Sequence, residues 1–365
     1  MSAPNDSTEI AAVGLVTPVG LYSESAAAAV RAGRSRARRT AVLDIAFAGQ
    51  AMHLVDEEYL EPLNPSINPA GMSPAHVRML RLGGAALAEA ASASPEPAPL
   101  LLALPERRSD VADPVRPTFI GDLTKQAGVV VAERQSALYR QGAAAVLFAL
   151  RDARLLLASG KASHVIVGGV DTFLDLARSA VLAAEGRLYG RSARLGFMPG
   201  EGAGFLLLRA GTPGGRSRRS PTLARLIAVG TGVEEGHRYS SKPYRGDGLA
   251  NAFESLFEAV PKGAPKVRCV YAGFNGEDTP VKEWATARLR NSERFADEIQ
   301  VEHPADCIGD SGAALGAIML GLAAMAISQG HSPEPRPIWA ADDPGPCLVW
   351  ATSDREPRAA ALLQW

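Results

Sequence analysis

The alternation of short apolar runs with alanine-rich stretches constrains the fold of this 365-residue chain more than any other feature. In the first part of the chain the apolar runs have the length of strands and end at turn residues. They are IAAVGLV (10–16), PLLLALP (99–105), GVVVAE (128–133), HVIVGGV (164–170) and AGFLLLRA (203–210). Helices are expected between them, at 22–33, 74–94, 142–159 and 173–184. This order predicts an α/β fold with a buried, largely parallel sheet and helices on both faces.

A stretch rich in glycine, proline, serine and arginine, GTPGGRSRRSPT (211–222), interrupts this alternation and marks a connection. Beyond it the alternation resumes. Strands are expected at 222–233, 266–274, 298–303, 346–352 and 359–363, and helices at 247–260, 281–291 and 313–328. Because the two parts have a similar make-up, we predict two α/β halves, residues 1–212 and 213–365.

The charge distribution argues against nucleic acid as the main partner. The net charge is -1, and the basic residues are scattered apart from two short runs, RAGRSRARR (31–39) and GGRSRRS (214–220). Both runs are interpreted as solvated loops. The polar start, MSAPNDSTE, is not typical of a signal peptide, and no apolar run approaches the ~20 residues that span a bilayer. We therefore expect a cytoplasmic protein without a membrane span.

The cysteines indicate the same compartment. Cys269, Cys307 and Cys347 are the three cysteines of the chain. They follow no metal-binding spacing and are too few for a disulfide framework, which fits a reducing cytoplasm. No pair of histidine, cysteine or acidic residues has metal-ligand spacing either, so no metal or other cofactor is expected.

The segment SALYRQGAAAVLFA (136–149) runs from a polar turn into a helix made almost wholly of small and apolar residues. Such a helix is normally buried, and its N-terminus brings the positive end of a dipole and unpaired N–H groups into the interior. This environment suits an anion or an activated nucleophile. The turn has no cysteine, and Ser136 comes too early. Tyr139 therefore either replaces a nucleophile or marks its loss.

Two motifs identify a family. GKASHVIVGGVDTFLD (160–175), followed by GFMPGEGAGFLLL (196–208), resembles the β-ketoacyl synthase family of the thiolase superfamily. In that family, a strand ending in Gly-Gly and an acidic residue precedes a glycine-rich segment that leads into the next strand. The matching residues are Gly168, Gly169, Asp171, Gly196, Phe197, Pro199, Gly200, Glu201, Gly202, Ala203 and Gly204. GLVTPVG (14–20) and RGDGLANAFESLFEAV (245–260) are similar to the opening elements of its two halves, so the resemblance covers nearly the whole chain.

The resemblance implies a thiolase-like five-layered α-β-α-β-α fold of two similar halves, whose sheets enclose a buried helix from each. It also implies a dimer whose sheets join across a two-fold axis. The apolar helix at 142–159 and the run GVVVAE (128–133) lie in the region through which the family dimerises.

The same resemblance implies where a catalytic Cys-His-His set would stand. Counting back from Gly142, the cysteine nucleophile falls on Tyr139. The two histidines fall on Asn275, in FNGEDTP (274–280), and on Asp310, in CIGDSGAALGA (307–317); the family's lysine falls on Ala305. The glycine-rich segment that helps to form the oxyanion hole falls on DREPRAA (354–360). Every catalytic position departs from the family pattern.

These substitutions disfavour decarboxylative condensation. A phenol has a pKa of ~10 against ~8.5 for a thiol, so Tyr139 would be a weak acyl acceptor. Asn275 would still donate a hydrogen bond, but an ionised Asp310 would repel the developing enolate. Pro357 removes an N–H from the oxyanion segment.

Three further residues are expected to contact a substrate at the same pocket. Arg355 and Arg358 are bulky, charged replacements in the oxyanion segment, and Cys307 precedes the Asp310 turn on a predicted strand.

Each candidate also has a structural interpretation. Tyr139 would plug a vacated pocket with its hydroxyl hydrogen-bonded. Asp310 would be an N-cap or first-turn acid of the next helix, and Asn275 would belong to an Asn-Gly turn. Cys307 would be a small buried hydrophobic residue.

We predict a non-catalytic partner or scaffold subunit, similar to a chain-length factor, in fatty-acid or polyketide-type metabolism. It would form a homodimer, or a heterodimer with an active ketosynthase, with an acyl carrier protein as a further partner. The alternative is an acyltransferase or hydrolase that acts on CoA or carrier-protein thioesters through Tyr139, Asn275 and Asp310, with Asp310 as general base. A third hypothesis is a pocket that binds a small acyl ligand without changing it. Fold analogy does not choose among these roles.

Overall fold

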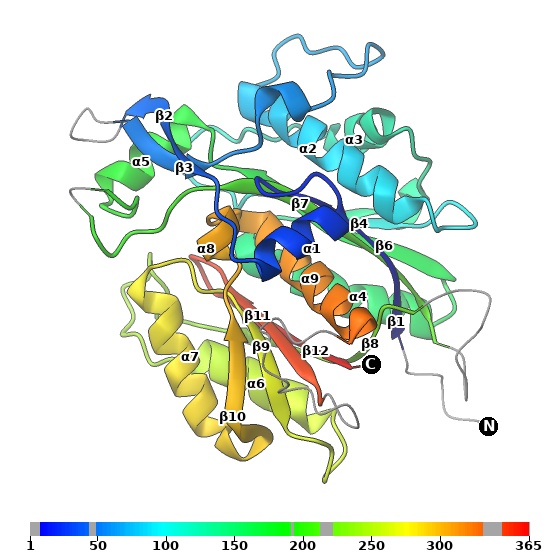
Figure 1. Cartoon of the computed structure of the whole chain (residues 1–365), viewed down its shortest axis with the longest axis vertical. Coiled ribbons are helices and arrows are strands. Elements are labelled where there is room, and N and C mark those ends of the chain that lie inside the picture. Colours follow the sequence, from blue (N-terminus) through cyan, green and yellow to red (C-terminus); the bar gives the residue numbers. More distant parts are fainter. Residues whose placement is uncertain (1–7, 44–48, 191–192, 212–221, 331–344, 365) are drawn as a thin grey trace.

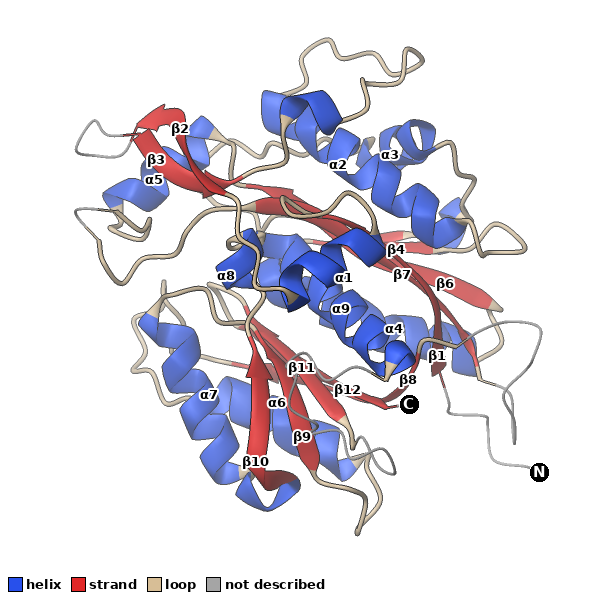
Figure 2. Ribbon diagram, viewed as in Figure 1, coloured by secondary structure: helices blue, strands red, loops and turns tan. Residues whose placement is uncertain are grey.

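The computed structural model describes residues 8–43, 49–190, 193–211, 222–330 and 345–364. Five layers follow one another across the molecule (Figure 1): outer helices, a half-sheet, a central helix layer, a second half-sheet and the outer helices of the second half. Figure 2 shows the strands in two groups with helices between them and outside them. The thiolase-like α-β-α-β-α fold expected from the sequence is confirmed.

Seven of the nine helices in the described residues keep close to the predicted ranges, and the two at 119–127 and 305–308 were not predicted. The helices are α1 (Ser23–Arg31), α2 (Pro74–Ala91), α3 (Phe119–Ala127), α4 (Ala145–Ala158), α5 (Leu176–Ala184), α6 (Asp247–Glu258), α7 (Asp278–Arg290), α8 (Ala305–Ile308) and α9 (Leu315–Gln329). The short 3-10 turns η3 (Gly142–Ala144) and η5 (Gly312–Ala314) lead into α4 and α9.

Ten strands form one hydrogen-bonded sheet in the order β10-β9-β11-β12-β8-β1-β7-β6-β4-β5. The strands of the first half are β1 (Thr8–Val16), β4 (Leu100–Ala103), β5 (Ala137–Tyr139), β6 (His164–Thr172) and β7 (Glu201–Ala210). Those of the second half are β8 (Ala224–Val233), β9 (Val267–Ala272), β10 (Phe295–Glu302), β11 (Cys347–Thr352) and β12 (Pro357–Gln364). The first five occupy one end of the sheet and the other five the opposite end. The division at residues 212 and 213 lies outside the described residues and stays a prediction.

The expectation of a largely parallel sheet is wrong. Only β4 with β5 and β6, and β9 with β10 and β11, pair in parallel. Each half adds two antiparallel strands to this three-stranded core: β7 and β1 in the first half, β12 and β8 in the second. Buried strands look alike in sequence whether they pair in parallel or not, so the apolar runs did not distinguish the two patterns.

The two half-sheets are joined by a short antiparallel pairing, in which Thr8–Ile10 of β1 meets 224–226 of β8. Beyond it they diverge and enclose α4 and α9 (Figure 1). Alternate residues of one strand face different layers: Leu101 packs in the central cluster, whereas Leu100 and Leu102 pack in the outer one. This is why the strands read as unbroken apolar runs.

Helix α9 is buried on all sides. Within the described residues, Gly312–Gln329 is the one helical stretch long and apolar enough to cross a membrane, and 83% of it is buried in the fold. The expectation that no apolar run approaches the length of a membrane span is therefore wrong for this stretch. Its composition is therefore explained by its place between the half-sheets.

Several elements differ from the sequence-based expectation. GVVVAE (128–133) is not a strand; the edge strand β5 begins only at Ala137. The hairpin of β2 (Ala37–Leu43) and β3 (Gly49–His53) was not predicted, and neither was α3. GVVVAE has the composition of a strand, but Gly128 at φ 65° ends α3 and the chain after it turns towards β5.

Candidate functional site

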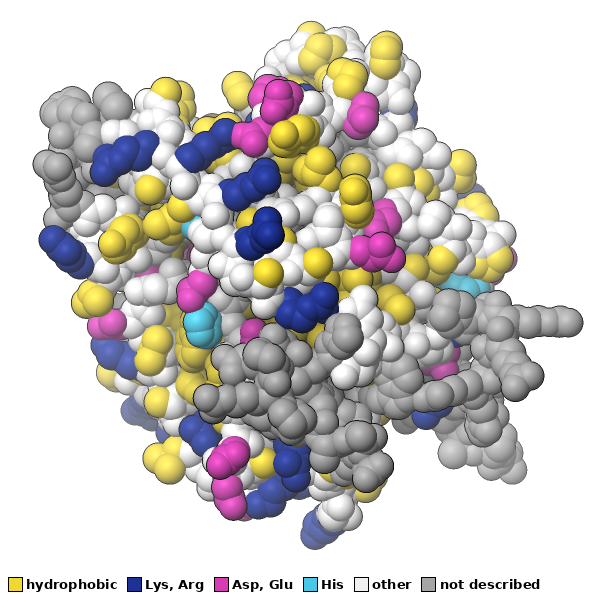
Figure 3. Space-filling model, viewed as in Figure 1, with side chains coloured by type: hydrophobic (Ala, Val, Ile, Leu, Met, Phe, Trp, Pro, Cys, Tyr) yellow, Lys and Arg dark blue, Asp and Glu magenta, His cyan; other side chains and the backbone are white. Residues whose placement is uncertain are grey.

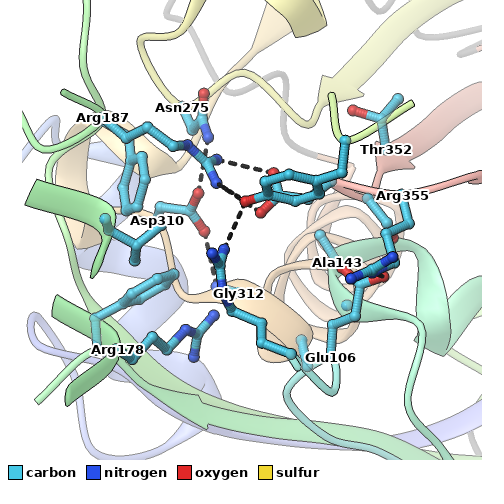
Figure 4. Close-up of a pocket in the computed structure, with 18 residues that line it drawn as sticks. Glu106, Ala143, Arg178, Arg187, Asn275, Asp310, Gly312, Thr352 and Arg355 are labelled. Carbon is cyan, nitrogen blue, oxygen red and sulfur yellow. Dashed lines mark hydrogen bonds and ion pairs between the residues drawn. The ribbon is translucent and has the colours of Figure 1, made fainter. Parts of the chain in front are cut away.

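The buried helices α4 and α9 begin at one pocket, where both halves of the chain meet (Figure 4). Gly142 and Ala143 line it at the start of α4, and Gly312 and Ala313 line it at the start of α9. Loops of both halves complete the lining, including Glu106, Arg178, Arg187, Tyr239, Asn275, Asp310 and 352–355. The cavity measures about 70 Å³, which is room for a few water molecules.

Asn275 and Asp310 meet in this pocket, as predicted. The Asn275 Nδ2 donates to Asp310 Oδ2 at 2.8 Å, and the Gly312 N–H donates to Asp310 Oδ1 at 2.8 Å. Burial raises the pKa of Asp310, although these two hydrogen bonds oppose the shift. Asn275 also accepts from the Glu277 N–H at 3.0 Å. The turn role proposed for Asn275 is therefore present. The N-cap or first-turn role proposed for Asp310 is wrong, because Asp310 lies one residue before Ser311, the N-cap of η5, and neither η5 nor α9 has an acidic residue in its first turn.

Tyr139 does not line the pocket, and the prediction that it converges with Asn275 and Asp310 is wrong. It is half-buried at the end of β5, and its hydroxyl donates to Asp152 Oδ2 of α4 at 2.8 Å. Burial and this carboxylate raise the pKa of Tyr139, so the phenol stays neutral. Strand β5 places the ring against the central cluster and α4, whereas the turn that follows reaches the pocket.

Gly142 is the residue of this turn that faces the pocket. A Cβ at position 142 would lie 3.3 Å from Ser353 Oγ and 3.6 Å from Glu106 Oε2. Gly142 has φ 69°, a left-handed conformation that favours glycine. Ser353 closes the start of the helix, because its Oγ accepts from the Ala144 N–H at 3.1 Å and donates to the Gln141 carbonyl. A side chain at position 142, three residues after Tyr139, would enter the cavity.

A buried ion-pair network fills one side of the pocket. Arg187 is 5% exposed and forms two hydrogen bonds to Glu277, at 2.9 and 2.8 Å, and two to Asp354, at 2.7 and 2.8 Å. Arg238 reaches Glu277 at 2.9 Å. Burial alone would lower the pKa of Arg187, but Glu277 and Asp354 raise it, so the guanidinium stays charged. Burial likewise opposes ionisation of Asp354, yet Arg187 holds the pKa of Asp354 below its usual range.

Glu106 is a carboxyl group of the pocket whose pKa is raised to near neutral pH. Burial, followed by the charge of Asp354, raises its pKa to about 7, although Arg355 acts in the opposite direction. The Arg355 Nε lies 3.5 Å from Glu106 Oε1. Arg355 and Arg108 both lie over the ring of Tyr239, at 5.5 and 5.1 Å from its centroid. Arg355 therefore does line the pocket, as expected; its contact with a substrate stays a prediction.

Cys307 and Arg358 are not among the residues that line this pocket. Cys307 lies in the short helix α8, not on a strand, and is 8% exposed with its Sγ 3.9 Å from the Val30 carbonyl. Arg358 is 1% exposed; its Nε and Nη2 donate to Glu283 Oε1 at 3.0 and 2.7 Å, and its Nη1 donates to the Ser353 carbonyl at 2.7 Å. It lines a smaller cavity that shares Asn275 and Asp310 with the pocket. By donating to the carbonyls of Ser353, Arg355 and Pro357, Arg358 stabilises the loop at 353–357.

The sequence did not point to Glu106, Arg178 or Arg187. Arg178 had one available signal: Asp171, which follows the Gly-Gly of the family motif at the end of a buried strand, needs a cation. The Arg178 Nη1 meets Asp171 Oδ1 at 2.7 Å, and Asp171 Oδ2 accepts from the Ala313 N–H at 2.9 Å. Glu106 and Arg187 lie in loops without a motif, and only the fold brings them to the pocket. In the described part of the chain, no group of three or more histidine, cysteine and acidic residues is placed to hold a metal ion.

Comparisons with known proteins identify the fold of this chain. No protein-family model matches the sequence, and no curated protein matches it. Solved structures do match. The ketosynthase from module 6 of the bacillaene synthase from Bacillus subtilis 168 is 16% identical, with a TM-score of 0.76 over 98% of this chain and 71% of that chain. The chain therefore has the thiolase-like fold of ketosynthases.

Two further matches cover both chains almost completely. The ishigamide ketosynthase/chain length factor is 17% identical, with a TM-score of 0.74 over 98% of each chain. The other is a type II polyketide synthase acyl-carrier protein in complex with its ketosynthase bound to the hexaketide. It is 15% identical, with a TM-score of 0.72 over 98% of this chain and 99% of that chain. At these identities the likeness establishes the fold alone.

Proposed function

We propose that this protein is a non-catalytic, ketosynthase-like partner or scaffold subunit of fatty-acid or polyketide-type metabolism, similar in role to a chain-length factor. One observation carries the proposal. The 18 residues that line the pocket include neither cysteine nor histidine, and the buried Arg187–Glu277–Asp354 network occupies one side of it.

The pocket chemistry is unfavourable for condensation. At the start of α4, Gly142 and Ala143 offer no nucleophile to hold an acyl group. The negative charge of an enolate would need hydrogen-bond donors. The arginines that line the cavity, Arg108, Arg178, Arg187 and Arg355, are instead paired with carboxylates. The cavity of about 70 Å³ is also smaller than the range of about 300–1,000 Å³ that is usual for small-molecule sites.

Pairing with itself or with an active ketosynthase is part of the proposal. Matched structures include one named as a ketosynthase/chain length factor and one of a carrier protein in complex with its ketosynthase. In this chain β5 is the last strand of the sheet, and Leu138 on it, Val130 before it and Leu155 on α4 are exposed apolar residues. An unpaired strand edge beside apolar side chains favours association with a second chain. We place this partner role in the cytoplasm, with an acyl carrier protein as a further partner.

A second function is supported by one specific observation. The pKa of about 7 for Glu106 places this carboxyl group in the range of a general base near neutral pH, and burial also raises the pKa of Asp310. With Asn275 as a hydrogen-bond donor, Glu106 or Asp310 would activate a water molecule against a CoA or carrier-protein thioester. This hydrolase or acyltransferase would not use Tyr139, which lies outside the pocket.

Thiol release from acyl-CoA and acyl-carrier-protein thioesters distinguishes the two functions. We expect the protein to release thiol no faster than a blank without protein, with an active ketosynthase assayed in parallel as the positive control. If the wild type releases thiol faster than the blank, and both Asp310→Ala and Glu106→Gln abolish this release, the thioester-cleaving function is established instead.

A further inference from the structure

The basic run at 31–39, interpreted from the sequence as a solvated loop, forms a continuous surface feature. All nine residues are exposed. Helix α1 ends at Arg31, and the N–H groups of Gly33 and Arg34 donate to the carbonyls of Val30 and Ala29, both at 2.9 Å. This cap fixes the turn that leads into β2. Figure 3 shows Lys and Arg side chains spread across this face, over α1 and β2.

The arginines of this run differ in whether they are paired. Arg38 pairs with Asp56, and Arg31 donates to Gln329 Oε1 at 3.2 Å. Arg34, Arg36 and Arg39 have no ion pair within the described part of the chain. Most arginines around the pocket, in contrast, are held by carboxylates.

A groove adjoins these arginines and contains Arg36 in its wall. Its lining is Pro18, Val19, Gly20, Leu21, Tyr22, Ser25, Arg36, Val55, Asp56 and Tyr59, and its volume is about 250 Å³. Tyr22 and Tyr59 are 59% and 50% exposed. The volume lies below the range of about 300–1,000 Å³ that is usual for small-molecule sites, and it suits an anchoring side chain. Exposed tyrosines beside an arginine are the residue types that dominate protein interfaces.

We propose that Arg34, Arg36 and the groove between Tyr22 and Tyr59 form a docking surface for an acidic protein segment. Carboxylates of the partner face the two arginines, and an apolar side chain enters the groove. Charge complementarity selects this occupant, because the local cations stand out on a chain whose net charge is -1.

The acidic residues around the groove favour a protein over a polyanion. Asp56 belongs to the groove wall, and the exposed Glu57 and Glu58 precede Tyr59. Asp56 pairs with Arg38, and Glu57 pairs with Arg78 and Arg81, so Glu58 is the acid of this group without an ion pair in the described residues. Its charge disfavours a nucleic acid or an anionic membrane, whose negative charge is continuous. A protein segment with carboxylates only opposite the arginines avoids this repulsion. None of these residues lines the pocket, so the docking surface is independent of the function proposed above.

Fluorescence anisotropy with a defined probe tests this surface. The probe is a fluorescein-labelled helical peptide of about 16 residues with glutamates on one face and leucines on the other. We expect the double variant Arg34→Glu/Arg36→Glu to weaken its binding by about tenfold or more. The matched control Lys262→Glu/Lys266→Glu makes the same change in charge at exposed residues of the other half, and should stay within about twofold of the wild type.

The apolar part of the surface has its own test. Tyr22→Ala/Tyr59→Ala should weaken binding of the leucine-containing probe by about fivefold and leave binding of polyglutamate unchanged. If circular dichroism shows that the glutamate double variant is unfolded, Arg34→Gln/Arg36→Gln replaces it, with a smaller salt dependence of binding as the expected result.

Three results would overturn the proposal. These are no binding of the acidic peptide by the wild type, an equal loss in the Lys262/Lys266 control, and tighter binding of oligo(dT) or phosphatidylserine vesicles through the same two arginines.

Discussion

The raised pKa of Glu106 makes the free energy of unfolding depend on pH. An ordinary glutamate pKa is 4.5, and that of folded Glu106 is about 7. Between these values the folded state binds more protons than the unfolded chain, so the free energy of unfolding falls as the pH rises. The stabilising contribution is complete below the unfolded pKa and is lost as the pH rises through the folded pKa.

Glu106→Gln should remove this dependence. We expect the variant to be more stable than the wild type by about 2–3 kcal/mol at about pH 8, with a difference that narrows towards zero near pH 4. Urea unfolding at several pH values measures the difference. A stability difference that stays constant across this range would show that Glu106 is not the buried titrating group.

Residue spacing in the sequence predicted the position of the candidate residues along the chain but not the direction of their side chains. Asn275 and Asp310 were found because their segments align with family motifs, and the structure joins them at 2.8 Å. Tyr139 was misplaced because a count back from Gly142 gives a position along the chain but not a direction. The side chain of Tyr139, the last residue of β5, points towards Asp152, whereas Gly142 faces Glu106 and Ser353.

The ion pairs of Arg187 join three connecting segments of the fold. Arg187 follows α5, Glu277 precedes α7, and Asp354 lies between β11 and β12. Arg187→Ala would leave the buried Glu277 without its bidentate partner, so we expect a loss of about 3–5 kcal/mol in the free energy of unfolding.

The control is Arg290→Ala, which removes a pair to Asp247 whose side chains are 47% and 43% exposed. That loss should be below about 1 kcal/mol. Guanidinium unfolding of both variants gives the comparison, and equal losses would contradict a structural role for the buried network.

Close packing between β1 and α2 sets a second test at the level of elements. A Cβ at Gly14 would overlap the Ala86 carbonyl and lie 2.8 Å from the Ala90 nitrogen, whereas a Cβ at Gly121 in α3 would meet nothing within 4 Å. We expect Gly14→Ala to cost about 1–3 kcal/mol or more. Gly121→Ala should stabilise by about 0.5–1 kcal/mol through helix propensity. Thermal unfolding tests both, and a tolerated Gly14→Ala would contradict this packing.

Element type followed from periodicity wherever an element is long and buried. The runs at 10–16, 164–170 and 203–210 became β1, β6 and β7, because strands covered on both faces are apolar throughout. The arginine-rich strand β2 has no such run, since most of its residues are exposed, whereas its partner β3 is mostly buried. Strand β5 has three residues, too few to show a period.

At the scale of the whole molecule, the two halves repeat one strand order. Reading inwards from the edge, β5-β4-β6-β7-β1 corresponds to β10-β9-β11-β12-β8, with the same parallel and antiparallel pairs. The sequence indicated two halves of similar make-up, but it did not reveal which strands pair, because pairing depends on long-range contacts.

The edge strand β5 provides a test of association. Leu138→Asp should weaken assembly, with itself or with a co-expressed active ketosynthase, by at least about tenfold, because the charge would be buried at the contact. The control is Leu289→Asp, since Leu289 on α7 is 77% exposed. Sedimentation velocity measures the change, and an unchanged complex for Leu138→Asp would exclude β5 from the interface.

The central claim is that a ketosynthase architecture has kept its fold and lost its acyl-holding group. Intact-mass spectrometry tests it most directly, after incubation with malonyl and acyl thioesters of CoA and of a carrier protein. The account predicts an unchanged mass, because no nucleophile stands at Gly142 or Ala143. A mass increase equal to one acyl group on this chain would contradict it.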